Sequence, residues 1–303
     1  MSRFATRALP VVVALLLPGT ACAQREQLSL RIEQFGGVDV GTARGSTRPI
    51  DYELRQLTAT VGVRTVRGRD DNTVLVNGLF YRRSDVGFGG VGSEDRALHA
   101  VYYDFLALRT LDDRHTLAVA LRPGLFGTLD YELGDQFRLE GAVFVDRLLT
   151  PRTTVGLGMS YTSNLGRVLP IPVVHIVHRR GRRVLIDGLL PSRLDLWYFP
   201  RKGVEVGLNA QLSGFQYFIG QAPQSAPPTP PGGTAIILRN PELQLANAII
   251  GPQVRWNATG KWFLSADAGV TVLRRYTVGT GRREGPLDPA NTGLVRIGLQ
   301  RMY

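Results

Sequence analysis

Apolar and polar side chains alternate along most of the chain after residue 24. In residues 204–213, VEVGLNAQLS, and again in residues 264–272, LSADAGVTV, every second residue is apolar, and the residues between are charged, polar or glycine. A period of two places successive side chains on opposite faces of a β-strand. Because helical periodicity is hard to find anywhere in the chain, the pattern predicts an all-β fold.

The length of the alternating segments separates two kinds of all-β protein. The apolar face is the core of a soluble sandwich or the lipid-facing surface of a membrane barrel. The segments run for about ten residues, the length that a tilted strand needs to cross a bilayer, whereas strands of soluble proteins are usually five or six residues long. The pattern therefore predicts a transmembrane antiparallel β-barrel.

The predicted connections alternate between short and long. Short ones lie near residues 68–72, 111–115, 148–153, 179–183, 200–203 and 257–261, and longer ones near 35–51, 84–97, 129–136, 218–242 and 276–290. Short periplasmic turns and long outer loops are typical of bacterial barrels. The order predicts an up-and-down meander of fourteen strands, or of twelve if residues 184–199 form one bent strand and the first segment is not a strand. The longest connection, residues 221–242, is rich in Pro and is predicted to be an outer loop whose role stays open.

Aromatic residues lie beside the predicted short turns. Trp197, Trp256 and Trp262, the three tryptophans of the chain, each precede or follow one of these turns closely. Amphipathic rings favour the border between lipid and water. The positions predict an aromatic girdle at the periplasmic rim.

The first 23 residues have the features of a secretory signal peptide. Arg3 and Arg7 precede an apolar run over residues 8–17, and Ala21-Cys22-Ala23 gives a small-residue cleavage site. The run is too short to span a membrane as a helix. We expect residues 1–23 to be removed and residues 24–303 to form a single barrel domain, secreted across the inner membrane. Cys22 raises lipidation as an alternative, but no large aliphatic residue stands three positions before it.

The last segment, residues 292–303, alternates up to an aromatic terminal residue. Val295, Ile297, Leu299 and Tyr303 share one face, and this pattern resembles the C-terminal signal of bacterial outer-membrane barrels. The resemblance implies the outer membrane of a Gram-negative-type bacterium as location, with outer-membrane lipids and the barrel assembly machinery as partners, the latter through the strand ending at Tyr303. Arg301 departs from the pattern, although Arg near a membrane rim can reach the headgroups.

A longer stretch is similar to a known family. It includes VGLGMSYTSNLGRVLPIPVVH, VLIDGLLPSRLDLWYFPRKGVEVGLNAQLSG and IIGPQVRWNATGKWFLSADAGV, with the pairs Leu169-Pro170 and Leu190-Pro191. These segments resemble a family of uncharacterised bacterial barrel-like proteins, domain of unknown function 6268. The resemblance implies a barrel over most of the mature chain and brings no catalytic residues with it.

Charge and candidate chemistry exclude several functions. The chain has 36 Lys and Arg against 25 Asp and Glu, a net charge of +11, but the basic residues are mostly scattered and form no nucleic-acid stripe. His175 and His178 are three residues apart on a predicted strand and so face opposite sides, which argues against a shared metal ion. We expect no nucleic-acid partner, no cofactor, no metal and no catalytic residues.

Charged residues of both signs fall on the predicted inner face. The candidates for lining the lumen are Arg64, Asp104, Arg138, Glu140, Asp146, Glu205, Arg255, Asp267 and Arg296. Glycine, Ser and Thr between them leave space for water, and a barrel of twelve to fourteen strands is wider than the filled eight-stranded kind. The lining predicts a passive channel or transporter for small polar solutes and no enzyme. A sealed structural or ligand-binding barrel is the alternative, and an outer-membrane hydrolase is the third hypothesis.

Overall fold

The computed structural model of the chain describes residues 26–40, 50–67, 72–88, 94–163, 165–166, 168–220, 242–280, 283–287 and 291–302. The predicted signal peptide, residues 221–241 of the Pro-rich connection and Tyr303 lie outside these ranges. Cleavage, lipidation, the role of the Pro-rich connection and the terminal residue therefore stay predictions.

The described residues form strands and one short helical turn. They are β1 (Glu26–Val40), β2 (Ile50–Arg67), β3 (Thr73–Phe88), β4 (Glu94–Thr110), β5 (His115–Gly127), α2 (Leu133–Gln136), β6 (Phe137–Thr150), β7 (Thr153–Thr162), β8 (Leu169–Arg180), β9 (Val184–Leu190), β10 (Arg193–Arg201), β11 (Val204–Phe218), β12 (Glu242–Thr259), β13 (Trp262–Thr280), β14 (Arg283–Leu287) and β15 (Gly293–Met302). No helix in this part of the chain is long and apolar enough to cross a membrane.

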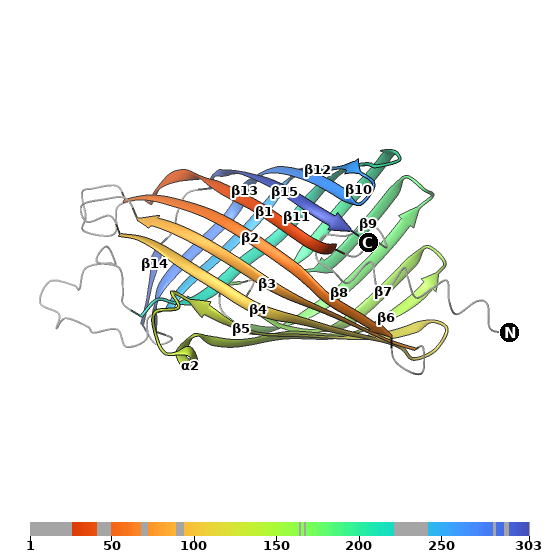
Figure 1. Cartoon of the computed structure of the whole chain (residues 1–303), viewed down its shortest axis with the longest axis horizontal. Coiled ribbons are helices and arrows are strands. Elements are labelled where there is room, and N and C mark those ends of the chain that lie inside the picture. The colour runs from red at the N-terminus through yellow and green to blue at the C-terminus, as the bar shows by residue number, and fades with distance from the viewer. Residues whose placement is uncertain are drawn as a thin grey trace, which may run out of the picture.

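The strands close into a barrel (Figure 1). Each strand from β1 to β13 pairs antiparallel with its neighbours in sequence, and β15 pairs with both β13 and β1. Because β14 and β15 pair with successive halves of β13, they occupy one position in the wall. The wall of the described chain therefore has fourteen positions, which confirms the predicted meander and the larger strand number.

The choice between fourteen and twelve strands depends on β9 and β10. Arg193 pairs with Leu189 and Tyr198 pairs with Val184, so the two strands form a hairpin with Pro191 and Ser192 at its tip. Two strands, rather than one bent strand, therefore occupy residues 184–201.

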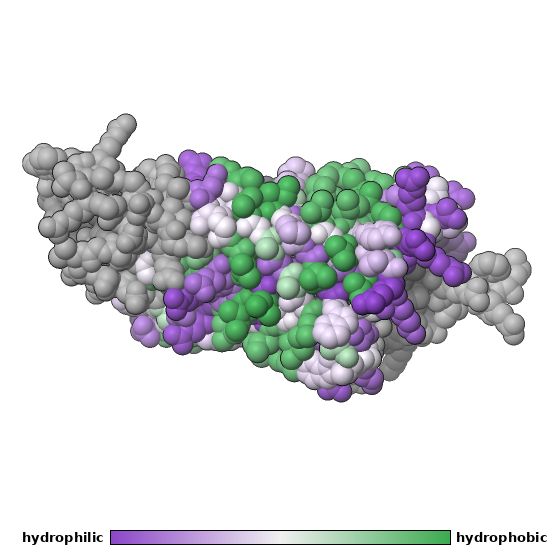
Figure 2. Space-filling view, turned by 90° about the horizontal axis from the view of Figure 1, so that it is seen from above, coloured by the Kyte–Doolittle hydropathy of each residue, from purple (hydrophilic) through white to green (hydrophobic). Residues whose placement is uncertain are grey.

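Apolar side chains cover the outside of the barrel and polar side chains lie within it. Large apolar residues are exposed on nearly every strand of the described wall, among them Leu30, Ile32, Leu57, Val61, Leu79, Leu121, Leu139, Val143, Leu157, Leu196, Leu208, Ile250, Val270 and Ile297. Figure 2 shows this apolar surface as a band between hydrophilic ends. The inner positions of the same strands bury Glu, Asp, Arg and Gln side chains. A soluble protein buries its apolar residues, so this distribution is inside out.

Several strands extend beyond the alternating segments from which they were predicted. β1 continues to Val40 and β3 to Phe88, so the described parts of these connections are shorter than predicted. A ladder of backbone hydrogen bonds needs no apolar face, so a strand can extend past the segment in which apolar and polar residues alternate. The sequence pattern therefore ends before the strand does.

Tight turns join the strands at the end of the barrel where β15 terminates. These turns, at residues 111–114, 151–152, 181–183, 202–203 and 260–261, match the predicted short connections, and we call this end the turn end. The opposite end, where α2 lies between β5 and β6, is called the loop end. Arg301 lies at the turn end over the Trp262 ring, with 5.8 Å between the guanidinium carbon and the ring centroid. Its departure from the apolar pattern thus falls at the rim.

The turn at residues 111–114 leads to a testable prediction about how the stability of the fold depends on pH. Asp112 accepts hydrogen bonds from the backbone N–H groups of Arg114 and His115 at 2.8 Å each, and its carboxylate lies 2.9 Å from Nδ1 of His115. The hydrogen bond from Arg114, and next that from His115, lowers the pKa of Asp112 below its usual value. A carboxyl whose pKa is lower in the folded state stabilises the fold above its unfolded pKa of about 3.9, and this contribution disappears as the pH falls through the folded value.

We therefore expect Asp112→Asn to lose less stability than the wild type on acidification below about pH 4. Denaturant unfolding at a series of pH values measures the difference. Asp113→Asn removes an equal charge from the same turn and controls for net charge. Parallel pH profiles for wild type and Asp112→Asn would contradict the prediction.

Candidate functional site

The structure places eight of the nine predicted lumen residues on the inner positions of their strands. They are Asp104 on β4, Arg138, Glu140 and Asp146 on β6, Glu205 on β11, Arg255 on β12, Asp267 on β13 and Arg296 on β15. The ninth, Arg64, belongs to β2, but its side chain lies outside the described residues. The pairing register of β2 and β3 shifts between Gly62 and Arg64, so the alternation cannot be carried across this point.

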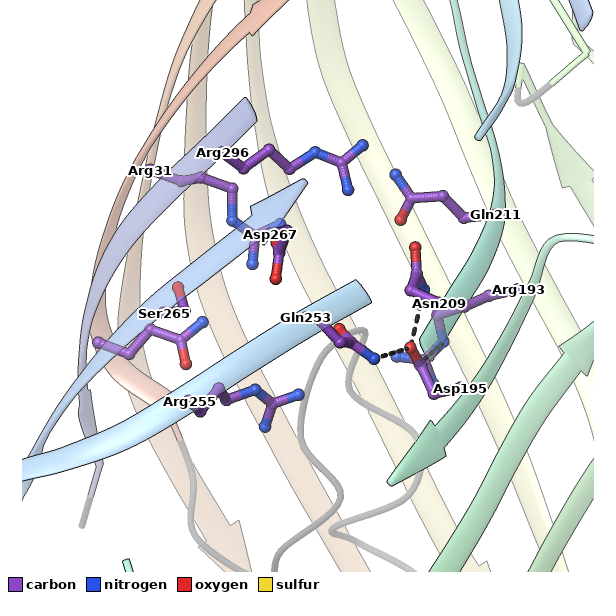
Figure 3. Close-up of a pocket in the computed structure, with 11 residues that line it drawn as sticks. Arg31, Arg193, Asp195, Asn209, Gln211, Gln253, Arg255, Ser265, Asp267 and Arg296 are labelled. Carbon is purple, nitrogen blue, oxygen red and sulfur yellow. Dashed lines mark hydrogen bonds and ion pairs between the residues drawn. The ribbon is translucent and has the colours of Figure 1, made fainter. Parts of the chain in front are cut away.

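Three of the eight meet at one cavity inside the barrel. The cavity has a volume of about 80 Å³ and is lined by Arg31, Arg193, Asp195, Asn209, Gln211, Gln253, Arg255, Ser265, Asp267, Arg296 and Gln300. These residues come from β1, β10, β11, β12, β13 and β15 (Figure 3). Space of this size holds several water molecules. We call it the polar cavity.

Ion pairs hold most of the arginines that line the polar cavity. Nη1 of Arg255 lies 3.3 Å from Oε2 of Glu205, and Nε of Arg296 lies 3.0 Å from Oε1 of Glu33. These four side chains are almost fully buried. A buried charge needs a partner of opposite sign, so these pairs fix the two arginines against the wall.

A second set of bonds fixes the opposite side of the polar cavity. Nδ2 of Asn209 and Nε2 of Gln253 both donate to Oδ1 of Asp195, at 2.7 and 2.9 Å (Figure 3). Arg193 lies 3.2 Å from Oδ2 of Asp195 and 3.3 Å from Oδ1 of Asp187. The cavity therefore has a preorganised polar lining that links β9 to β12.

Trp197 does not belong to the predicted aromatic girdle, because its side chain is buried inside the barrel. Its side chain is only 1% exposed, and the guanidinium carbon of Arg255 lies 4.0 Å from its ring centroid. Trp197 shares the inner face of β10 with Asp195, so it points into the barrel. Trp256, by contrast, is exposed on the outside. The prediction was wrong for Trp197 because closeness to a turn does not decide on which face a side chain lies.

A buried apolar cluster that the sequence pattern did not indicate lies inside the barrel toward the loop end. Its members are Phe35, Leu54, Val86, Leu98, Ala100, Tyr102, Phe126, Tyr217, Ile219, Leu243, Leu245, Ile249, Tyr276 and Leu294, from β1 to β5 and from the segment β11 to β15. We call this set the loop-end cluster. Alternation places Leu54, Val86 and Leu243 on the inner faces of their strands, but it does not show that these residues meet across the lumen.

The loop-end cluster joins opposite walls of the barrel. The hydroxyls of Ser84 on β3 and Tyr217 on β11 lie 3.2 Å apart, and the guanidinium carbon of Arg82 lies 4.0 Å from the Phe215 ring centroid. Because β3 and β11 are not neighbours in the wall, these contacts cross the lumen. They close the lumen of the described chain at this level.

On the loop-end side of β6 to β10, the ends of β5 and β11 bend toward each other and narrow the wall. The tips of β5 and β11 meet directly through a bridge between Gly127 and Phe218, although five strands separate them in sequence. A Cβ atom at Gly127 would lie 2.7 Å from the Phe218 carbonyl oxygen, so only glycine permits this approach. β9 and β10, with 7 and 9 residues, end below this level. The barrel is therefore narrower at the loop end than at the turn end.

Val168, just before β8, and Arg138, at the start of β6, contact the outer side of β11 and β12 where the barrel is narrow. The backbone N–H of Val168 donates to Oε1 of Gln216 at 2.9 Å, and Arg138 at the start of β6 forms an ion pair with Glu242 at the start of β12. Gln216 and Glu242 occupy outward positions of their strands, and they also bond to each other. The predicted lumen residue Arg138 thus bridges the inner face of β6 and the outer face of β12.

The remaining predicted residues form two separate groups. Nε of Arg122 lies 2.7 Å from Oδ1 of Asp104, and its Nη1 lies 3.6 Å from Oε2 of Glu140. Asp146 pairs instead with His175, with 2.8 Å between Oδ1 and Nδ1. Both residues of this pair are buried, and Nε2 of His175 has no hydrogen-bond partner in the described part of the chain. The structure therefore does not gather all eight residues into one site.

Glycine makes the buried pair of Asp146 and His175 possible. The two residues lie on β6 and β8, with Gly156 of β7 between them. A Cβ atom at Gly156 would lie 2.0 Å from Oδ1 of Asp146. Among the described residues, no three His, Cys, Asp or Glu side chains form a group suited to a metal ion.

Comparisons with protein families and curated proteins give no match. No model of a known family matches the chain, and no curated protein does. The resemblance to domain of unknown function 6268 therefore stays a prediction.

Solved structures of outer-membrane proteins are similar to the chain. An outer-membrane channel from Pseudomonas putida F1 has 9% identity over 91% of this chain and 94% of its own, with a TM-score of 0.42. The TodX monoaromatic hydrocarbon channel has 7% identity over 97% and 93%, with a TM-score of 0.44. LpxR from Salmonella typhimurium has 9% identity over 91% and 100%, with a TM-score of 0.34. At scores this low, these likenesses assign no activity to this chain.

Proposed function

We propose that the chain is an outer-membrane β-barrel of a Gram-negative-type bacterium that lets small polar solutes pass through its lumen. The observation that carries the proposal is the inside-out distribution: exposed apolar side chains surround the wall, while Arg255, Arg296, Glu205 and Asp195 are buried within it. An apolar band on a closed barrel is suited to lipid, and a polar interior is suited to water and solutes. The lipid contact and the insertion of β15 by the assembly machinery belong to this proposal.

Passage requires the loop-end cluster to open. The polar cavity has room for small solutes, but the contacts of Tyr217 and Phe215 with β3 close the lumen above it. Apolar side chains that meet across a lumen form a barrier to hydrated solutes. We therefore propose a gated path and not a permanently open pore. The mixed charges of the lining predict weak ion selectivity.

One observation favours a sealed barrel as the second candidate. The loop-end cluster joins strands on opposite sides of the described wall, and its members are nearly inaccessible to solvent. In this alternative the cluster never opens, and the polar cavity serves binding or merely holds charges in place. A hydrolase built on the pair of Asp146 and His175 is less well supported, because Nε2 of His175 has no hydroxyl partner in the described part of the chain.

Conductance in planar lipid bilayers tests the proposal. We expect rare, short openings from the wild type and longer openings from the double variant Tyr217→Ala/Leu243→Ala, because the truncations remove side chains from the loop-end cluster. The matched control is Val177→Ala/Leu185→Ala. It truncates a buried apolar cluster confined to β8, β9 and β10, which does not cross the lumen, and should leave the openings unchanged.

The result separates the two candidates. Longer openings in the loop-end variant alone support gated passage. No channel steps from the wild type or from either variant, with the barrel shown to be folded, would favour the sealed barrel.

A further inference from the structure

We propose that the polar cavity binds a small zwitterion of amino-acid size, with its carboxylate at Arg31 and its ammonium group at Asp267. This inference rests on the proposed function and names a solute class for that path. It begins from two charged side chains that line the cavity and that make neither an ion pair nor a hydrogen bond within the described part of the chain.

The charge balance of the cavity excludes a simple anion site. Four arginines line it, namely Arg31, Arg193, Arg255 and Arg296. Each of the last three already has a carboxylate partner within 3.3 Å. With Asp267 included, five carboxylates lie in the cavity or in direct contact with its arginines. A lone anion would pair with Arg31 but would also lie close to the unpaired negative charge of Asp267.

Arg31 and Asp267 lie on two strands that flank β15. Arg31 pairs in register with Gly298, and Asp267 pairs with Arg296, two residues along the same strand. Figure 3 marks no ion pair between these two side chains. The strand between them carries no side chain at Gly298, and Oγ of Ser265 fills that position, since a Cβ atom there would lie 2.5 Å from it. Both charged side chains line the polar cavity, so a ligand within the cavity can reach both.

A third group adds an acceptor to the same side. Gln300 is 3% exposed, and its Oε1 has no hydrogen-bond partner in the described chain. A buried acceptor without a donor is costly. An ammonium group has three N–H donors, so it satisfies a carboxylate such as that of Asp267 and retains a donor for an acceptor such as Gln300.

Size restricts the ligand further. A cavity of about 80 Å³ holds several water molecules, which corresponds to glycine or alanine more closely than to a sugar or a long side chain. Acetate satisfies Arg31 but leaves Asp267 unpaired, and methylammonium does the reverse. A zwitterion pairs both charges at once, which is the reason for preferring it over either ion.

Calorimetric titration of the purified, detergent-solubilised protein tests the inference. The probes are glycine, acetate and methylammonium at matched ionic strength. We expect glycine to bind, and the two ions to bind about tenfold more weakly or less. Arg31→Gln and Asp267→Asn should each weaken glycine binding by about tenfold or more. Asp267→Asn is isosteric, whereas Arg31→Gln gives a shorter, neutral polar side chain. Circular dichroism and thermal unfolding show whether the barrel stays intact in both variants.

The matched control changes an exposed pair outside the cavity. Arg83 and Asp85 lie 2.8 Å apart near the loop end of β3, and Arg83→Gln or Asp85→Asn should leave glycine binding unchanged. Acetate binding as tightly as glycine, with Asp267→Asn neutral, would overturn the inference in favour of an anion site. Methylammonium binding as tightly, with Arg31→Gln neutral, would overturn it in favour of a cation site.

Failure of this inference is distinguishable from failure of the proposed function. Channel steps in the bilayer without glycine binding would overturn the zwitterion site and leave passage standing. Glycine binding without channel steps from any variant would support the site in a sealed barrel.

Discussion

Replacing Leu121 by Arg is expected to prevent most of the protein from inserting into lipid, while Leu149→Arg leaves insertion intact. Leu121 lies midway along β5 on the outside of the barrel, with 44% of its side chain exposed, and Leu149 lies next to the turn that follows β6, with 53% exposed. The chemical change and the exposure are thus matched. Only the position along the barrel differs.

The physical reason is the depth of the new charge. A cation on the lipid face of a barrel costs about 2–4 kcal/mol at the bilayer midplane and about 0–1 kcal/mol near the interface. At Leu149 the Arg side chain reaches the headgroups. At Leu121 the nearest polar surroundings are several residues away along the strand.

Folding into lipid vesicles, followed by the gel shift between folded and heat-unfolded barrel, measures the inserted fraction. Denaturant unfolding of whatever inserts gives the difference in free energy. Equal effects at Leu121 and Leu149 would mean that the apolar band does not face lipid. The assignment of the outer face to a membrane would then be wrong.

The strand order could be predicted from the sequence because every strand of the wall repeats the same local pattern. The outer face of the wall is apolar, so residues 204–213 and 264–272 carry the same alternation. Tight turns at residues 202–203 and 260–261 then fix the direction of the chain. The alternation and the turns both depend on residues close together in the chain, so both can be recognised in a single sequence.

The closed loop end could not be predicted, because it depends on contacts between distant segments. Gly127 meets Phe218, and Ser84 meets Tyr217, across more than ninety residues in the first case and 133 in the second. Nothing in the alternation shows that β5 and β11 approach each other above the shorter strands. A wall of fourteen positions was therefore predicted, but not its inward fold.

The inner charges could be predicted only as far as their face. Alternation places Glu205, Arg255 and Asp267 inside, but it does not say which carboxylate meets which arginine. Trp197 also shows how far the position of a side chain can be predicted from the sequence. Its spacing from Asp195 places it on the inner face of β10, whereas its closeness to a turn does not determine its face.

Glu205→Gln is expected to destabilise the folded barrel by about 3–5 kcal/mol, since it leaves the buried Arg255 without its charged partner. The two side chains are 8% and 6% exposed, with 3.3 Å between Oε2 and Nη1. Replacing both residues, as in Glu205→Leu/Arg255→Met, removes the uncompensated charge together with its partner and should restore most of the lost stability. The exposed pair of Arg83 and Asp85 is the control, and Asp85→Asn should leave the unfolding free energy close to that of the wild type.

Denaturant titration of the four proteins in one detergent gives these free energies from the transition midpoints and slopes. The comparison isolates burial, because both pairs join an Arg to a carboxylate and differ chiefly in access to water. A loss at Glu205→Gln as small as that at Asp85→Asn would mean that water reaches Arg255 and screens its charge. The interior near the turn end would then be a wet channel wall, and the paired charges would contribute little to holding the barrel together.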